Sequence, residues 1–405
     1  MRINRLLGGT AAAAAFCLAA AGTIPSASAG PVTWHRVAHH SCTATPARGH
    51  VACNALLRVR VSSTGEHAAA TAAPSGYGPS DLQSAYALPS STKGSGQTVA
   101  VVDAYNDPDA ASDLATYRSQ YGLPACTVAN GCFKQVSQTG STTSLPRNNG
   151  GWAEEESLDL DMVSAICPLC HIDLVEASST TTASLGTAEN EAAKLGATEI
   201  SNSYGGSESS SDTSYDSAYY NHPGIAITAS SGDDGYGVEY PAASQYVTSV
   251  GGTSLTRSST ARGWTETVWD DAGSGCSSVD AQPSWQKANS QITSVCSRRA
   301  VADVSADADP NTGVAVYDSY SYEGYSGWLV FGGTSVASPI IASVYALAGN
   351  GSSVTYGSYP YSHTSSLNDV TSGSNGSCSK ARLCTGESGW DGPSGLGTPE
   401  GTGAF

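Results

Sequence analysis

The stretch GQTVAVVDAYNDPDAASDLATYRSQYG, Gly96–Gly122, decides the fold class of this chain. Its first half is a continuous apolar run rich in β-branched residues, which predicts a strand buried on both faces. Its second half predicts a helix. A buried strand followed by a helix is the repeating unit of a parallel sheet.

The same alternation continues along the chain. ATEISNSYGG (Ala197–Gly206) and GIAITASSGDDG (Gly224–Gly235) predict strands, and DSAYYNHPG (Asp216–Gly224) predicts a helical segment between them. We therefore expect an α/β fold: one domain over residues 76–405, with a mostly parallel central sheet and helices on both faces. Catalytic groups in such sheets gather at the carboxyl ends of the strands.

The N-terminus predicts export. Residues 1–29 combine a charged start, an apolar alanine- and leucine-rich stretch and the cleavage signal Ala27-Ser28-Ala29, which is typical of a secretory signal peptide. Residues 30–75 lack a sustained apolar period, so we expect a short propeptide or linker with little fold of its own. The mature protein should be extracellular.

Composition restricts the partners. The formal net charge is −17 and only 13% of residues are charged, so nucleic acid and anionic membranes are not expected to bind. We expect a monomer that acts on protein or peptide substrates.

The cysteines also fit an oxidising compartment, because ten remain once Cys17 leaves with the signal peptide. Pairing of sequence neighbours is the simplest prediction. It joins Cys42 to Cys53, Cys126 to Cys132, Cys167 to Cys170, Cys276 to Cys296, and Cys378 to Cys384. CPLCH (Cys167–His171) could instead be half of a zinc knuckle, but no second Cys-x-x-Cys accompanies it.

FGGTSVASP, Phe331–Pro339, carries a candidate nucleophile. Small residues precede Ser335, and the following VASPIIASVYALAG runs at helical spacing, so Ser335 begins a helix whose N-terminus favours negative charge. A simple N-cap would also explain a serine or threonine here. The whole string favours a nucleophile, because small residues let a carbonyl approach the backbone.

A serine nucleophile needs a base. None of the eight histidines stands in a His-Gly-Thr context, although His171 and His222 remain candidates for histidine-based catalysis at neutral to alkaline pH. GGWAEEESLDLDMVSAICP (Gly150–Pro168) offers carboxylates instead, since Glu155 and Asp159 fall on the apolar face of the predicted helix.

Two carboxylates one turn apart on a buried face are costly unless they share a proton, and such a pair titrates together. Glu155 would act as the base and Asp159 would orient it. An acidic first turn that complements the helix dipole would explain Glu154 and Glu156, but not Asp159.

Asp233, in the strand end SSGDDG, is a candidate oxyanion donor if its carboxyl is protonated, which predicts activity in acid. Asp-Asp-Gly is also a turn signal.

These residues together resemble the sedolisins, or serine-carboxyl peptidases. The matching motifs are EEESLDLD, SNSYGG, SSGDDG, YPAASQYVTSVGGTSL, DVSADADPNTGVAVYDS, GGTSVASP and NDVTSG followed by GWDGPSGLGTP. The resemblance implies a subtilisin-like fold, a Ser335-Glu155-Asp159 triad, an oxyanion Asp233 and hydrolysis of peptide bonds at acid pH. It leaves endopeptidase and tripeptidyl-peptidase action open.

The resemblance also implies one Ca²⁺ site. Asp369 and Asp391 would supply side-chain ligands, and Val370, Glu387 and Gly389 backbone carbonyls. A cluster of Asx turns is the alternative.

The chain departs from the family pattern at several positions. Tyr204 replaces a common tryptophan, Asp103 stands where some members have an auxiliary glutamate, and Glu387 replaces a glycine. The N-terminal segment is also much shorter than a typical propeptide. The departures at Tyr204 and in the N-terminal segment leave a non-catalytic binding module on a protease-like scaffold as the alternative function.

Overall fold

The central sheet confirms the predicted fold class. The computed structural model describes residues 34–43, 45–63 and 73–405, so the predicted signal peptide lies outside the described residues. Eight strands form the sheet: β4 (Thr98–Ala104), β5 (Phe133–Ser137), β6 (His171–Ala177), β7 (Glu199–Asn202), β9 (Ala226–Ser230), β11 (Thr248–Arg257), β12 (Trp264–Val268) and β15 (Val304–Asp307). Their order is β12-β11-β9-β7-β4-β6-β5, with β15 beside β11, and every pair except β11–β12 is parallel.

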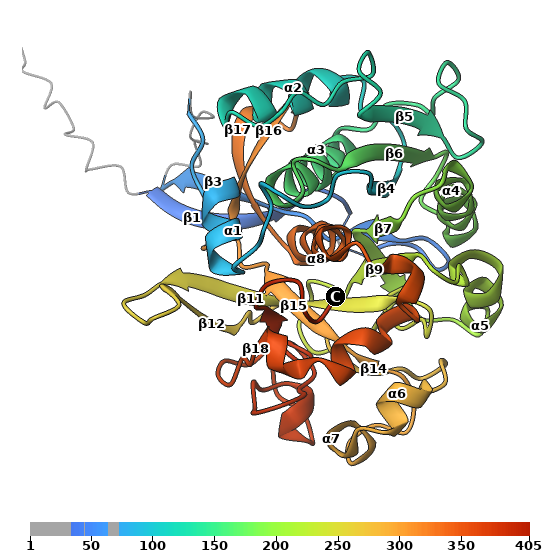
Figure 1. Cartoon of the computed structure of the whole chain (residues 1–405), viewed down its shortest axis with the longest axis vertical. Coiled ribbons are helices and arrows are strands. Elements are labelled where there is room, and N and C mark those ends of the chain that lie inside the picture. The colour runs from blue at the N-terminus through green and yellow to red at the C-terminus, as the bar shows by residue number, and fades with distance from the viewer. Residues whose placement is uncertain (1–33, 44, 64–72) are drawn as a thin grey trace, which may run out of the picture.

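Helices cover both faces of this sheet (Figure 1). On one face lie α1 (Pro79–Ala85), α2 (Ala110–Gln120), α3 (Gly150–Ile166) and α8 (Thr334–Ala348), and on the other lie α4 (Thr182–Leu195) and the short α5 (Asp212–Tyr215). The predicted helical segment before β9 is a single π turn, Asp216–Tyr220, which follows α5 directly.

Smaller elements surround the C-terminal half. They are α6 (Ser284–Lys287), α7 (Ser290–Thr293), the strand pair β13 (Gly275–Cys276) and β14 (Ala300–Val301), and the pair β18 (Leu367–Asn368) and β19 (Thr398–Pro399). Five disulfides join the cysteines as predicted, so the zinc alternative for Cys167 and Cys170 is excluded. None of the helices that the described residues form has the length and apolar composition to cross a bilayer.

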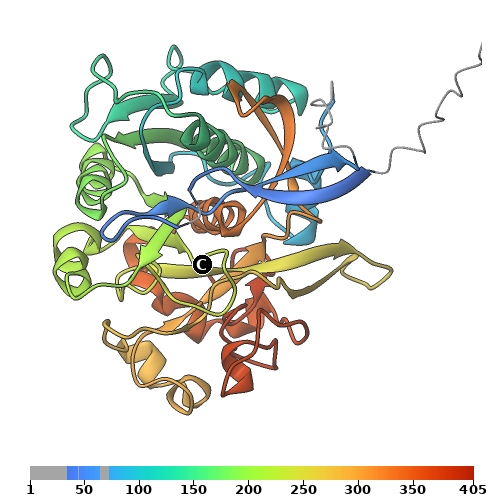
Figure 2. The same ribbon diagram turned by 180° about the vertical axis from the view of Figure 1, so that it is seen from behind.

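The N-terminal segment is folded, and the expectation of an irregular linker over 30–75 is wrong for 34–62. It contains β1 (Trp34–His40), β2 (Ala52–Cys53) and β3 (Leu56–Ser62). β3 lies in an antiparallel sheet of order β1-β3-β17-β16, with β16 (Val314–Tyr322) and β17 (Tyr325–Gly332). β2 pairs with β8 (Tyr204–Ser207), whose other neighbour is β10 (Glu239–Tyr240). Figure 2 shows the segment, in blue, crossing the face of the molecule.

Candidate active site

Ser335 lies in the first turn of α8, at the junction with β17. Gly333 precedes the helix with a φ of 95°, a left-handed conformation that glycine adopts without strain. The Ser335 side chain is fully buried. Its hydroxyl donates to the carbonyl oxygen of Ser203 (3.1 Å), and its backbone N–H donates to the carbonyl oxygen of Asn54 (3.1 Å).

The helix α3 presents Glu155 and Asp159 to Ser335, as its spacing predicts. Asn149 caps this helix by accepting from the backbone N–H of Trp152 (3.2 Å). Asp159 accepts from the hydroxyl of Ser203 (2.8 Å). Ser203 therefore contacts Ser335 through its carbonyl and Asp159 through its side chain. This serine belongs to the SNSYGG motif, whose sequence alone assigns it no role.

Both carboxyls of the pair are held toward the protonated form. Burial raises the pKa of Glu155 well above its usual range, and Asp159 and Asp103 raise it further, while interaction with the Ser335 hydroxyl partly lowers it. Burial and then Asp103 raise the pKa of Asp159, while the hydroxyl of Ser203 and the neighbouring Glu155 oppose the rise. A proton shared within this pair is the arrangement that avoids two buried negative charges.

Asp233 follows β9 and faces the start of α8. Its Oδ1 accepts from both the backbone N–H and the hydroxyl of Thr334, each at 2.7 Å. Its Oδ2 is buried and has no hydrogen-bond partner among the described residues. Burial raises the pKa of this carboxyl well above its usual range, even though Thr334 lowers it in part. A proton is therefore favoured, and Oδ2 is the position that can donate it.

The same place is closed to any side chain at position 333. A Cβ on Gly333 would lie 2.0 Å from the carbonyl oxygen of Asn54 and 2.5 Å from Oδ2 of Asp233. These two oxygens therefore flank one small volume beside the Ser335 N–H. A carbonyl oxygen placed there meets two donors, the backbone N–H and a protonated Asp233.

A second group of buried carboxyls lies close to the pair. Burial raises the pKa of Asp103 to about 8 and that of Glu176 to about 8. Glu156 accepts from the backbone N–H of Asp107 (2.9 Å) and its pKa is raised well above its usual range, by burial and then by Glu176. The helix begins at Gly150, so Glu154 and Glu156 lie beyond its first turn and the interpretation of an acidic first turn is wrong. Both residues are buried, because α3 is enclosed on all sides.

Tyr204, the departure noted in the sequence, is buried beside Trp152 of α3. Its hydroxyl donates to the side-chain oxygen of Asn202 (2.6 Å), and its ring lies 6.3 Å from that of Trp152. Tyr204 in this position does not separate Glu155 or Asp159 from Ser335.

The two histidine candidates lie elsewhere. His171 is the first residue of β6 and is exposed, and His222 lies in the loop that enters β9. Both positions are at the amino ends of parallel strands, whereas Ser203 and Asp233 lie at the carboxyl ends. Histidine-based catalysis at Ser335 through either residue is therefore excluded by position.

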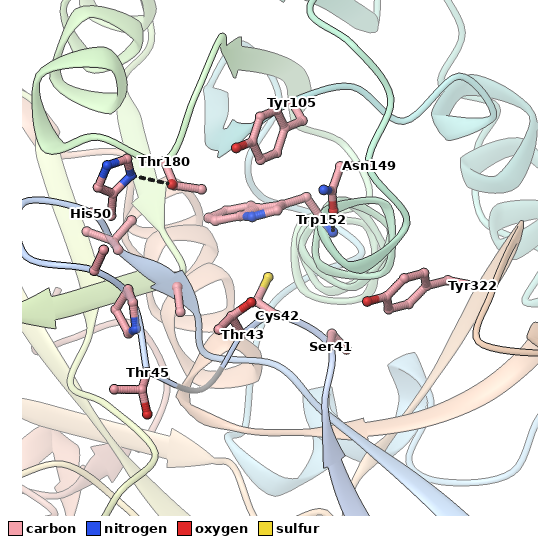
Figure 3. Close-up of a pocket in the computed structure, with 14 residues that line it drawn as sticks. Ser41, Cys42, Thr43, Thr45, His50, Tyr105, Asn149, Trp152, Thr180 and Tyr322 are labelled. Atoms are coloured by element: carbon pink, nitrogen blue, oxygen red, sulfur yellow. Dashed lines mark hydrogen bonds between the residues drawn. The ribbon is translucent and has the colours of Figure 1, made fainter.

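The N-terminal segment closes the site from outside. A cavity of about 290 Å³ lies between residues 41–43, 45–47 and 50–52 of this segment and the body of the protein (Figure 3). Tyr105, Trp152 and Tyr322 form its aromatic wall, and His50 on the segment side bonds Thr180 (2.9 Å). The N-terminal segment thus covers the site and contacts Ser335 through Asn54. The sequence did not predict this cover.

The five residues of the implied calcium site lie in neighbouring loops: Asp369, Val370, Glu387, Gly389 and Asp391. Asp369 accepts from the backbone N–H of Gly389 (3.1 Å), and Asp391 from that of Glu387 (3.0 Å). The Glu387 carboxylate pairs with Arg382 (2.7 Å), which leaves only its backbone carbonyl for a cation. Among the described residues, no three His, Cys, Asp or Glu side chains are arranged to hold a metal, so a site here needs backbone oxygens.

Comparisons with known proteins identify relatives of this chain. A sequence model of the subtilase family (Peptidase_S8) matches residues 163–354. Kumamolisin from Bacillus sp. (strain MN-32) is 32% identical over 377 residues, which cover 85% of this chain and 66% of that protein. Sedolisin from Pseudomonas sp. (strain 101) is 28% identical over 396 residues, which cover 85% of this chain and 63% of the relative. The chain thus spans slightly less than two thirds of the length of these two curated relatives.

Solved structures give the same result. The structure of Pseudomonas sedolisin, a serine-carboxyl proteinase complexed with two molecules of pseudo-iodotyrostatin, superposes with a TM-score of 0.67 at 26% identity, covering 82% of this chain and 96% of that one. The S41 psychrophilic protease, at 19% identity and a TM-score of 0.52 over 82% of this chain and 99% of its own, shares the fold. By sequence and by structure, the chain belongs to the sedolisin family and has its subtilisin-like fold.

Proposed function

We propose that this protein is a secreted serine-carboxyl peptidase that hydrolyses peptide bonds of proteins or peptides at acid pH. The observation that carries the proposal is the hydrogen-bonded chain from Ser335 through Ser203 to Asp159, with Glu155 beside it. Family membership supports the reaction type. A non-catalytic binding module would not require this buried set of groups around a serine at a helix N-terminus.

The reaction begins when Oγ of Ser335 attacks the peptide carbonyl and Glu155 takes its proton. Asp159, fixed by Ser203, orients Glu155 and stabilises its charged form. The oxyanion receives hydrogen bonds from the Ser335 N–H and from protonated Asp233. Glu155 then protonates the leaving amine, an acyl-enzyme forms at Ser335, and water releases it by the same steps in reverse order.

Acid pH follows from the oxyanion donor. Burial raises the pKa of Asp233, so its carboxyl is protonated in acid and loses the proton as the pH rises. An ionised Asp233 would repel the oxyanion. Activity should therefore be present in acid and decline toward higher pH.

Substitution of the nucleophile or of its base should abolish most of the activity. Ser335→Ala should lower casein hydrolysis at pH 3 to 7 by roughly 10⁴-fold or more, and Glu155→Gln by a comparable factor, because the nucleophile and its base act as a unit. Ser343→Ala is the matched control: it changes a buried serine two turns further along α8 whose hydroxyl has no partner among the described residues. Full activity in Ser335→Ala would contradict the proposal.

We also propose that the loops around Asp369 and Asp391 bind Ca²⁺. Burial raises the pKa of Asp391 to about 7, and the charge of Asp369 adds to the rise, so a cation between them would relieve an unfavourable pair. At pH 7, a chelator should lower the melting temperature, and added Ca²⁺ should restore it. Asp369→Asn should remove this response, whereas Asp109→Asn, at a half-buried aspartate outside these loops, should keep it. A wild type whose melting temperature ignores the chelator would exclude the site.

A further inference from the structure

Ser203 lies where the chain passes from one sheet to another. β7 ends at Asn202 in the central sheet, and β8 begins at Tyr204 in the sheet that also contains β10. Ser203 itself is fully buried and has no register partner in the sheets that the described residues form. Its hydroxyl nevertheless donates to Asp159 (2.8 Å). Sheet pairing therefore does not fix the direction of this hydroxyl.

A hydrogen bond between the two neighbours of Ser203 takes the place of sheet pairing. The hydroxyl of Tyr204 donates to Oδ1 of Asn202 (2.6 Å), so the residue after Ser203 is joined to the residue before it. Both side chains are buried, which keeps water from competing for this bond. The bond limits the backbone rotations that are open to Ser203, because its two flanking residues cannot move apart.

Asn202 is itself anchored to β9. Its amide nitrogen donates to the carbonyl oxygen of Thr228 in that strand (3.2 Å). The Thr228 hydroxyl in turn donates to the carbonyl oxygen of Ser338 (3.1 Å) and lies 2.9 Å from the Ser338 hydroxyl. Ser338 lies about one turn after Ser335 in α8, which packs on β7 and β9 (Figure 1). Buried hydrogen bonds thus connect the Tyr204–Asn202 bond to the helix that carries the nucleophile.

The ring and the hydroxyl of Tyr204 make separate contacts. The ring packs beside Trp152 of α3, with 6.3 Å between the ring centroids, and a phenylalanine would keep this contact. The hydroxyl bonds to Asn202, and a phenylalanine would lose that bond. A single substitution can therefore remove the bond across Ser203 without removing the packing of the ring.

We propose that Asn202 and Tyr204 are positioning residues that hold the Ser203 hydroxyl against Asp159 during peptide hydrolysis. The proposal rests on the proposed function. The Ser203 hydroxyl holds Asp159 by Oδ1 and leaves Oδ2 for Glu155. Without the Tyr204–Asn202 bond, Ser203 can rotate, and Asp159 is correctly oriented in a smaller fraction of the substrate complexes. The loss should therefore appear in kcat and not in KM.

Two substitutions test the bond from its two sides. Tyr204→Phe should lower kcat for casein at pH 4 about tenfold, the effect of one lost buried hydrogen bond, and leave KM within about twofold. Asn202→Asp keeps the acceptor for Tyr204 but loses the donor to Thr228, and it places a carboxyl beside the buried Glu189. It should lower kcat at least as much.

Matched controls change the same residue types away from Ser203. Tyr117→Phe alters a buried tyrosine of α2 whose hydroxyl has no partner in the described part of the chain. Asn190→Asp alters an asparagine of α4 whose amide donates to the carbonyl oxygen of Ala218 (3.1 Å). Both should keep the wild-type kcat. Melting temperatures are measured in parallel, because a purely structural role would lower the melting temperature of Tyr204→Phe and leave its kcat unchanged.

A double-mutant cycle with Ser203→Ala shows whether the bond acts through Ser203. Once the Ser203 hydroxyl is absent, Tyr204→Phe should lower kcat by less than about twofold further. A tenfold loss that persists in the Ser203→Ala background, or a wild-type kcat in Tyr204→Phe, would overturn the proposal. Ser335→Ala is measured alongside: full activity there refutes the proposed function, whereas an active wild type with an unaffected Tyr204→Phe refutes only the positioning role.

Discussion

Asp233 is anchored through one carboxyl oxygen, and this leaves the other oxygen positioned as a donor. Thr334 supplies both hydrogen bonds to Oδ1, so the carboxyl cannot rotate without losing them. The orientation is therefore fixed before any carbonyl arrives, which is what stabilisation of an oxyanion requires.

Asp233→Asn tests the proton on this residue. An amide N–H donates at every pH, so Asp233→Asn should keep its activity within about tenfold of the wild type in acid. It should also lose less activity toward pH 7 than the wild type does. Asp233→Ala has no donor and should lower activity roughly 10²- to 10³-fold at every pH. The measurement is kcat/KM against pH, with Asp234→Asn, the exposed neighbour, as control. Identical pH profiles for wild type and Asp233→Asn would show that Asp233 does not cause the decline of kcat/KM toward higher pH.

The site residues differ in how far local sequence could predict them. Glu155 and Asp159 could be paired because helical spacing places both on one face, and Ser335 because its motif is local. Ser203 and Asn54 could not be assigned a contact, because each meets Ser335 only through tertiary packing. The site residues that could be predicted are those whose position depends on a single helix or local motif.

At the scale of elements, α3 and α8 were predictable as helices, but the enclosure of α3 was not. The sheet, α8, α2 and β16 surround this helix, so Glu154, Glu156 and Asp161 are buried as well as Glu155 and Asp159. The strand β3 did carry a signal, since Leu57 and Val59 are buried and alternate with Arg58 and Arg60. That run is short, and its partner β17 lies far along the chain, so pairing could not be inferred from it.

The described part of the chain encloses several carboxyls that pair with no cationic side chain within it. Burial is the largest cause of the raised pKa of each: Asp107 to about 7, Glu154 to about 7, Glu189 to about 8, Glu199 to about 8 and Asp318 to about 9. In the unfolded chain such groups titrate near 4. The folded protein therefore binds more protons than the unfolded chain between about pH 4 and 8.

This difference fixes the sign of the dependence of stability on pH. A group whose pKa is raised by folding contributes fully below its unfolded pKa, and that contribution is lost as the pH rises through its folded pKa. The free energy of unfolding should thus be greatest near pH 4 and fall toward pH 8. Denaturant unfolding of Ser335→Ala, which avoids self-digestion, measures it. Adding Glu199→Gln removes one of these titrating groups, so the free energy of unfolding should fall less steeply with pH. A free energy of unfolding that rises with pH would show that these carboxyls are ionised in the folded protein.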